Sequence, residues 1–145
     1  LRVMHTEAGA DGALLIGADL QKDAAIIDAA YNDSAGVTEQ FNLNILRHLN
    51  RTFGGNFDLD AFEHRASYER DEGRVVVELV SKRDQEASLG DARIEFERDE
   101  AIITEYSHKY TLEQFAEMTE EAGFTVEQVW TDPKKWFSVQ YCTRD

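Results

Sequence analysis

The apolar residues of this 145-residue chain repeat with two different periods. Between Val37 and Phe53 they recur every four residues, and two glycines follow directly, which predicts a long amphipathic helix that ends at Gly54. The apolar stripe of this helix consists of Phe41, Ile45, Leu49 and Phe53, and Leu46 widens it. After Phe57 apolar and polar residues alternate instead, as they do in half-buried strands. The change of period indicates a helical region followed by a region built mainly of strands.

Four segments of the alternating region are predicted to form an antiparallel meander. They are residues 64–70, 74–83, 92–98 and 101–110. The sequence "QEASLGD" between the second and third segments has the composition of a turn.

A helix and a hairpin are predicted to close the chain. Thr111 and Gln114 stand at the spacing of a capping box, and Gly123 is expected to stop the helix that they begin. The following strands, 124–130 and 136–142, flank a turn that contains Pro133.

The N-terminal region is expected to form a buried strand and a short helix. The apolar run Ala13–Ile16 ends at a glycine, as a strand in a parallel sheet does. Asp23 is predicted to cap a helix that ends near Tyr31. A buried parallel strand needs neighbours on both sides, and the chain opens with Leu1 in what reads as the tail of a helix. We therefore expect the chain to be a fragment.

Composition narrows the possible partners and the location. A formal net charge of -14 argues against nucleic acid as a partner, because binding to phosphates needs clustered Lys and Arg. The sequence contains no apolar run near the roughly 18 residues of a membrane span, so no membrane contact is expected. The single cysteine, Cys142, excludes a disulfide within one chain and favours a reducing, cytoplasmic location.

The sequence "TEYSHKY", from Thr104 to Tyr110, places several polar groups in a predicted strand. In a strand, Glu105 and Ser107 share one face, and the pair could hold a small group with both an N–H and a lone-pair nitrogen, such as an imidazole. A strand face exposed to water is the alternative explanation of this pattern. Tyr31 likewise has two interpretations, a core side chain or a hydroxyl presented to a cleft.

The sequence gives little support for a metal site, a nucleophilic side chain or a cofactor loop. The histidines and Cys142 are not at a zinc-binding spacing, so we predict no metal site. Ser107 lies outside a G-x-S-x-G motif, and the glycines do not form G-x-G-x-x-G, so neither a serine nucleophile nor a cofactor loop is predicted. No residue can be assigned as a general base or other catalytic group.

Five sequence blocks together carry a resemblance to a known family. They are "LLIGADLQKD", "AAYNDSAGVTEQFNLNILRHLNR", "FDLDAFEHRASY", "TEYSHKY" and "VWTDPKKWFSVQY". They resemble the C-terminal half of the L-histidine Nα-methyltransferases of ergothioneine biosynthesis, which use S-adenosylmethionine. The resemblance implies an α/β fold, namely the C-terminal half of a class I (Rossmann-like) SAM-dependent methyltransferase fold with an inserted antiparallel β-meander that binds the substrate. The implied domains are residues 1–56 (core), 57–110 (meander) and 111–145 (closing helix and hairpin).

The resemblance also implies a substrate site. Tyr31 would bind the carboxylate end of L-histidine, and Glu105 and Ser107 would hold its imidazole, with Tyr106 between them. The neutral α-amine would attack the methyl group of the cofactor repeatedly, which gives the trimethylated betaine, hercynine. Placing the two reactants in line is the main contribution expected of such an enzyme.

The cofactor is expected to bind mainly to the half that precedes Leu1, so no cofactor-binding residue is assigned here. The fragment alone would then be inactive, and it would self-associate through its unpaired sheet edge. Two alternatives stay open: a related N-methyltransferase that acts on another amine, and a non-catalytic binding module.

Overall fold

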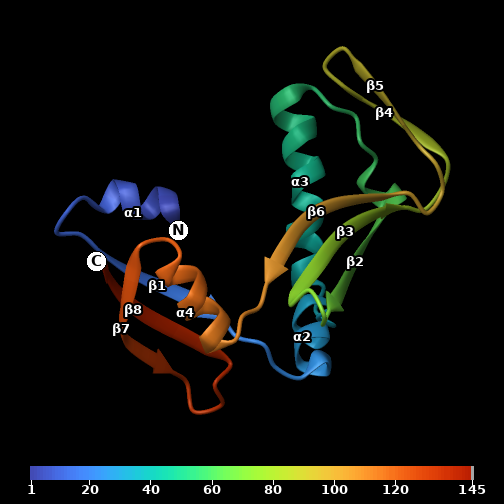
Figure 1. The fold of residues 1–145 in the computed structure, drawn as a ribbon. Helices are drawn as coiled ribbons and strands as arrows, with labels where there is room; N and C mark the ends of the chain where they lie inside the picture. Colours follow the sequence, from blue (N-terminus) through green and yellow to red (C-terminus); the bar gives the residue numbers. More distant parts are fainter. Residues whose placement is uncertain (145) are drawn as a thin grey trace. The chain divides into compact units, whose positions relative to one another are not determined.

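The computed structural model describes residues 1–144 and contains helices and strands in mixed order (Figure 1). The helices are α1 (Arg2–Ala8), α2 (Ala24–Tyr31), α3 (Val37–Phe53), the 3₁₀ helix η1 (Leu59–Ala61) and α4 (Leu112–Glu120). The strands are β1 (Ala13–Asp19), β2 (Phe62–Glu69), β3 (Arg74–Ser81), β4 (Gln85–Leu89), β5 (Ala92–Phe96), β6 (Ala101–His108), β7 (Phe124–Thr131) and β8 (Phe137–Arg144). None of the helices described for residues 1–144 has the length and apolar character needed to cross a membrane.

Backbone contacts divide the chain into two compact units. Unit 1 contains Leu1–Lys22 and the residues from His108 onward, and unit 2 contains Asp23–Ser107. The sequence had grouped residues 1–56 together, but α2 and α3 pack against β2 and therefore belong to the same compact unit as the strands that follow them.

Unit 1 is built on a three-stranded sheet in the order β1-β8-β7. Strand β8 is antiparallel to both neighbours, and Leu15 pairs with Tyr141. The strand predicted at Ala13–Ile16 is present, and its neighbour among the described residues is the antiparallel β8. Its parallel neighbours were expected outside this chain, so the parallel pairing stays a prediction. In the sheet β1 is an edge strand, and Leu15 is 67% exposed. The reason is that the described residues pair β1 with β8 on one side and offer only a bridge between Leu20 and Tyr110 beyond it.

The capping box and the closing hairpin of unit 1 are confirmed. The Thr111 hydroxyl accepts from the backbone N–H of Gln114, and the Gln114 side chain accepts from the N–H of Thr111. Between β7 and β8 the turn is organised by Asp132, whose carboxylate accepts from the backbone N–H groups of Trp136 and Phe137. These hydrogen bonds, with that of Phe137 the largest contribution, lower the pKa of Asp132.

Unit 2 contains a three-stranded sheet, β2-β3-β6, and a separate hairpin, β4–β5 (Figure 1). The predicted four-strand meander is therefore wrong, and the "QEASL" segment that was predicted as a turn is strand β4. The cause lies at Ser81, whose N–H donates to the carbonyl of Glu100 and whose carbonyl accepts from the N–H of Asp99. Because the two residues just before β6 pair with the end of β3, the segment between β3 and β6 loops out of the sheet and forms a hairpin of its own.

Helix α3 has the predicted bounds but buries only part of the predicted stripe. Phe41 and Phe53 of the predicted stripe are 70% and 56% exposed, whereas Asn42 and Leu46 are each 2% exposed. Leu46 packs in a core cluster with Phe57, Phe62, Leu79, Ala87 and Phe96. The buried face thus contains Leu46 of the predicted stripe, with Leu49 packed beside it, and also a polar residue, Asn42.

The turn between α2 and α3 depends on the carboxylate of Asp33. It accepts from the backbone N–H groups of Val37 and Thr38, both at 2.9 Å, which would otherwise be unpaired at the start of α3. These bonds, that of Thr38 first, lower the pKa of Asp33 from 3.8 to about 2. The ionised carboxylate is therefore the form that stabilises the turn.

Asp33→Asn is expected to lower the melting temperature at pH 7, because an amide offers one oxygen where the carboxylate offers two. The native pKa is lower than the unfolded one, so the stabilisation is complete above about pH 4 and is lost between about pH 4 and 2. The difference between the parent and Asp33→Asn should therefore shrink over this range in thermal unfolding followed by circular dichroism. Asp28→Asn, at an exposed position of α2, is the matched control. A difference that is independent of pH would contradict this role.

Candidate functional site

Tyr31 links the end of α2 to the end of β6. It is the last residue of α2, and its half-buried ring packs against a cluster formed by Ile27, Ala66, Val75 and Val77. Its hydroxyl oxygen lies 2.6 Å from Oγ of Ser107, a hydrogen bond between residues that are 76 positions apart in sequence. Two of the four residues that the sequence assigned to the substrate are thus brought together within unit 2.

Strand β6 is held in place beside β3 close to this contact. The hydroxyl of Thr104 donates to the carbonyl of Val77 at 3.0 Å. From Ala101 to Glu105 exposed and half-buried residues alternate, but Glu105 and Tyr106 are then both exposed before the half-buried Ser107. Exposure thus stops alternating at this point, and Glu105 and Ser107 differ in burial.

Tyr106 makes a different contact. The guanidinium carbon of Arg74 lies 4.3 Å from the centre of the Tyr106 ring, and Nε of Arg74 donates to Glu69 at 2.8 Å. The hydrogen bond from Arg74 to Glu69 is the main reason why the pKa of Arg74 is raised. Tyr106 is 45% exposed and is engaged by Arg74, whereas Ser107 is engaged by Tyr31. Neighbouring strand residues point to opposite faces, so these two contacts belong to different faces of β6.

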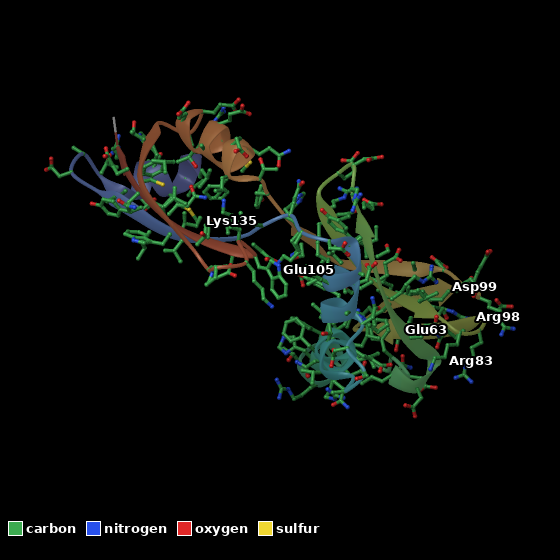
Figure 2. The ribbon with its side chains drawn as sticks, turned by 90° about the horizontal axis from the view of Figure 1, so that it is seen from below. Glu63, Arg83, Arg98, Asp99, Glu105 and Lys135 are labelled. Carbon is green, nitrogen blue, oxygen red and sulfur yellow. The ribbon has the colours of Figure 1, made fainter. Side chains whose placement is uncertain are left out.

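Glu105 is exposed and belongs to β6 (Figure 2). Within residues 1–144 its carboxylate makes no hydrogen bond and no ion pair, so it is available to a ligand or to water. Its pairing with Ser107 around an imidazole stays a prediction.

A small polar cavity adjoins Tyr31. It has a volume of about 210 Å³ and is lined by Tyr31, Asn32, Asp33, Glu39 and His64. Neither His64, which bonds to the Tyr31 backbone, nor the buried Asn42 beside it was predicted from the sequence to have a role. No sequence pattern identified them, because Asn42 lies outside the predicted apolar stripe of α3 and its burial becomes visible only in the fold.

A larger hollow, of about 870 Å³, lies elsewhere in unit 2 and is lined by residues 84–86 and 95–100. Figure 2 labels Asp99 from this hollow and Glu105, which lie towards opposite ends of β6. The hollow is therefore separate from the contact between Tyr31 and Ser107. Across the described residues 1–144, no group of three or more His, Cys, Asp or Glu side chains is placed to hold a metal ion.

Gly17, which lies within β1, does not form a cofactor cradle. A Cβ added to Gly17 would lie 2.6 Å from Cζ of Phe137, so the space above this glycine is filled by a phenyl ring. Gly17 is needed for side-chain packing within unit 1. Gly17 therefore offers no open backbone surface to a cofactor.

Comparison with known proteins places this chain in a family. Residues 1–144 match the family described as "Histidine-specific methyltransferase, SAM-dependent". The chain is 38% identical to a histidine N-alpha-methyltransferase of Mycolicibacterium smegmatis over 133 residues, which are 90% of this chain and 41% of the relative. It is 30% identical over 112 residues to ergothioneine biosynthesis protein 1 of Schizosaccharomyces pombe, covering 77% of this chain and 14% of that protein.

An L-tryptophan methyltransferase, trpM, of Psilocybe serbica is 27% identical over 133 residues, with 89% of this chain and 36% of the relative covered. The chain therefore spans less than half the length of each of these relatives. The match over residues 1–144 shows that the chain belongs to the family of histidine-specific, SAM-dependent methyltransferases.

Proposed function

We propose that this chain forms the substrate-binding part of an enzyme that methylates the α-amino group of L-histidine to hercynine, in the biosynthesis of ergothioneine. The observation that carries the proposal is the contact between the hydroxyls of Tyr31 and Ser107. It joins two family-matched sequence blocks that lie far apart in the chain. The names of the mycobacterial and fission-yeast relatives support the substrate and the pathway.

Each residue of the proposed site offers a group suited to histidine. Ser107 can both donate and accept, and the Tyr31 hydroxyl is a donor for the substrate carboxylate. Glu105 offers a charged acceptor for an imidazole N–H, and such bonds are about twice as strong as neutral ones. The residues of this chain would hold the two ends of the substrate, which leaves the α-amine as the free reactive group.

S-adenosylmethionine is proposed to bind mainly to a part of the enzyme outside this chain. The absence of a glycine-rich loop in the sequence and the filled space above Gly17 support this assignment. In the late part of a class I methyltransferase fold, unit 1 would supply the closing hairpin, β7–β8, and unit 2 the substrate module.

A second candidate substrate is another aromatic amino acid, because one relative is named an L-tryptophan methyltransferase. The two candidates differ in what they need from β6. An imidazole has one N–H and one lone-pair nitrogen for the two residues, whereas an indole has only an N–H. An imidazole substrate therefore makes fuller use of Glu105 and Ser107.

A calorimetric titration of the complete enzyme, with S-adenosylhomocysteine present, tests the proposal. L-histidine is expected to bind, and L-tryptophan is expected to bind much more weakly. Tighter binding of L-tryptophan would replace the proposed substrate. Binding of neither amino acid would favour a non-catalytic binding module.

Glu105→Ala in the complete enzyme is expected to weaken histidine binding by roughly 1–3 kcal/mol, on the order of ten- to a hundredfold, because the imidazole N–H loses a charged acceptor. Affinity for S-adenosylhomocysteine alone should change little. The double substitution with Ser107→Ala should cost less than the sum of the two single changes, since both residues contact one ring.

Glu63→Ala is the matched control for this test, since Glu63 is an exposed glutamate on β2 of the same sheet (Figure 2). It should leave histidine binding unchanged. If Glu105→Ala binds histidine as tightly as the parent, the exposed carboxylate faces only water.

The isolated 145-residue chain is expected to self-associate through β1. This strand lies at the edge of its sheet and carries the exposed Leu15, and such an edge can pair with another chain. Light scattering should show a mass that rises with concentration, and Leu15→Lys should reduce it. A constant monomer mass at high concentration would contradict this expectation.

A further inference from the structure

The end of α2 requires a hydrogen-bond donor from elsewhere in the fold. The last four carbonyls of an α-helix have no partner within the helix, and Tyr31 is the last residue of α2. His64, on β2, supplies the donor, because its Nε2 lies 2.8 Å from the Tyr31 carbonyl oxygen. The backbone that carries the proposed substrate residue is thus tied directly to the sheet.

The neighbouring residues determine which nitrogen of His64 carries the proton. Nδ2 of the buried Asn42 lies 2.9 Å from the carbonyl oxygen of Glu78 and 3.0 Å from Nδ1 of His64. A backbone carbonyl can only accept, so it is the NH₂ group of Asn42, with its two hydrogens, that lies at this position. One hydrogen goes to Glu78 and the other goes to His64. Nδ1 of His64 is therefore an acceptor, and Nε2–H is the donor to Tyr31.

We propose that His64 is a positioning residue for the substrate site: as the Nε2–H tautomer fixed by Asn42, it holds the end of α2 so that the Tyr31 hydroxyl meets Ser107. The chain of contacts runs from the Glu78 carbonyl through Asn42 and His64 to Tyr31. Asn42 donates to both Glu78 and His64, and His64 in turn donates to Tyr31, so only one placement of the hydrogens satisfies all three contacts. The catalytic importance of this arrangement rests on the proposed function, but the geometry of Tyr31 does not.

A second hydrogen bond holds Asn32, the residue after Tyr31, and it limits the expected effect of changing His64. Nδ2 of Asn32 donates to the carbonyl of Ala66 on β2 at 3.1 Å. Because this bond remains when His64 is changed, α2 should stay attached to the sheet. Loss of the His64 donor should then shift Tyr31 without unfolding unit 2.

Two substitutions separate positioning from simple stability. In His64→Gln the side-chain NH₂ can occupy the place of Nε2 and keep a donor for the Tyr31 carbonyl. In His64→Asn the shorter side chain can keep an acceptor for Asn42 near the place of Nδ1, but it cannot reach Tyr31. His48→Gln, at an exposed position on α3, is the matched control.

The first measurement uses nuclear magnetic resonance on the complete enzyme without ligand. The ¹⁵N shifts of the imidazole should show a proton on Nε2 of His64 and none on Nδ1. A nuclear Overhauser contact between the Tyr31 ring and Ser107 should be present in the parent, in His64→Gln and in His48→Gln, and it should be lost or weakened in His64→Asn. A proton on Nδ1 alone, or an unchanged contact in His64→Asn, would overturn the proposal.

The second measurement is the affinity of the complete enzyme for L-histidine. His64→Asn should weaken binding about three- to tenfold, the effect of one lost hydrogen bond, while His64→Gln should stay within about twofold of the parent. If satisfying Asn42 were the only role of His64, His64→Asn would bind better than His64→Gln, and this order would overturn the proposal. If the parent enzyme does not bind histidine while the magnetic-resonance results are as expected, the proposed function fails and the positioning of Tyr31 by His64 stands.

Discussion

The hydrogen bond between the hydroxyls of Tyr31 and Ser107 is the interaction on which the proposed site depends. Its two oxygens are 2.6 Å apart, and they come from a helix end and a strand end separated by most of unit 2 in sequence. The bond can form only if α2 is fixed on one face of the β2-β3-β6 sheet and β6 is fixed at its edge. The packing of Ile27 on Val75 and Val77 fixes the helix, and the Thr104 hydroxyl bond to Val77 fixes the strand.

Polar contacts complete what apolar packing leaves undetermined. Burial of Ile27 brings α2 onto the sheet, but the hydrophobic effect is not directional, so burial alone does not determine where the Tyr31 hydroxyl points. The hydrogen bonds from His64 and Asn32 to the end of α2 and to β2 add that direction. A site made of short hydroxyl and carboxylate groups needs this precision, because hydrogen bonds weaken steeply with distance and angle.

Local signals in the sequence predicted the local structure well. The bounds of α3, the Asp23 cap of α2 and the capping box of α4 all depend on residues within a few positions of one another. The closing hairpin was also predicted, although its turn depends on Asp132 more than on Pro133. The family resemblance added Tyr31 and Ser107, whose contact no local pattern reveals.

The sequence could not determine which residues far apart in the chain pack or pair with one another. The stripe containing Phe41 satisfies the helical period, but which residues of α3 are buried depends on the sheet that meets the helix. Leu46 of the stripe is buried together with the polar Asn42, whereas Phe41 is exposed. The "QEASL" segment is a strand of a separate hairpin, because the end of β3 pairs with residues 99–100, just before β6. His64 gave no motif, since its role comes from three residues on α2, α3 and β3 that meet only in the fold.

A double-mutant cycle on histidine binding tests most directly whether Tyr31 and Ser107 act as one substrate-holding pair. The affinity of the complete enzyme for L-histidine would be measured for the parent, Tyr31→Phe, Ser107→Ala and the double variant. The two residues share a hydrogen bond and a proposed ligand, so a coupling energy of about 0.5–3 kcal/mol is expected, with the double variant weaker than the parent by less than the sum of the single losses. Independent, additive losses, or no loss in any variant, would contradict the account.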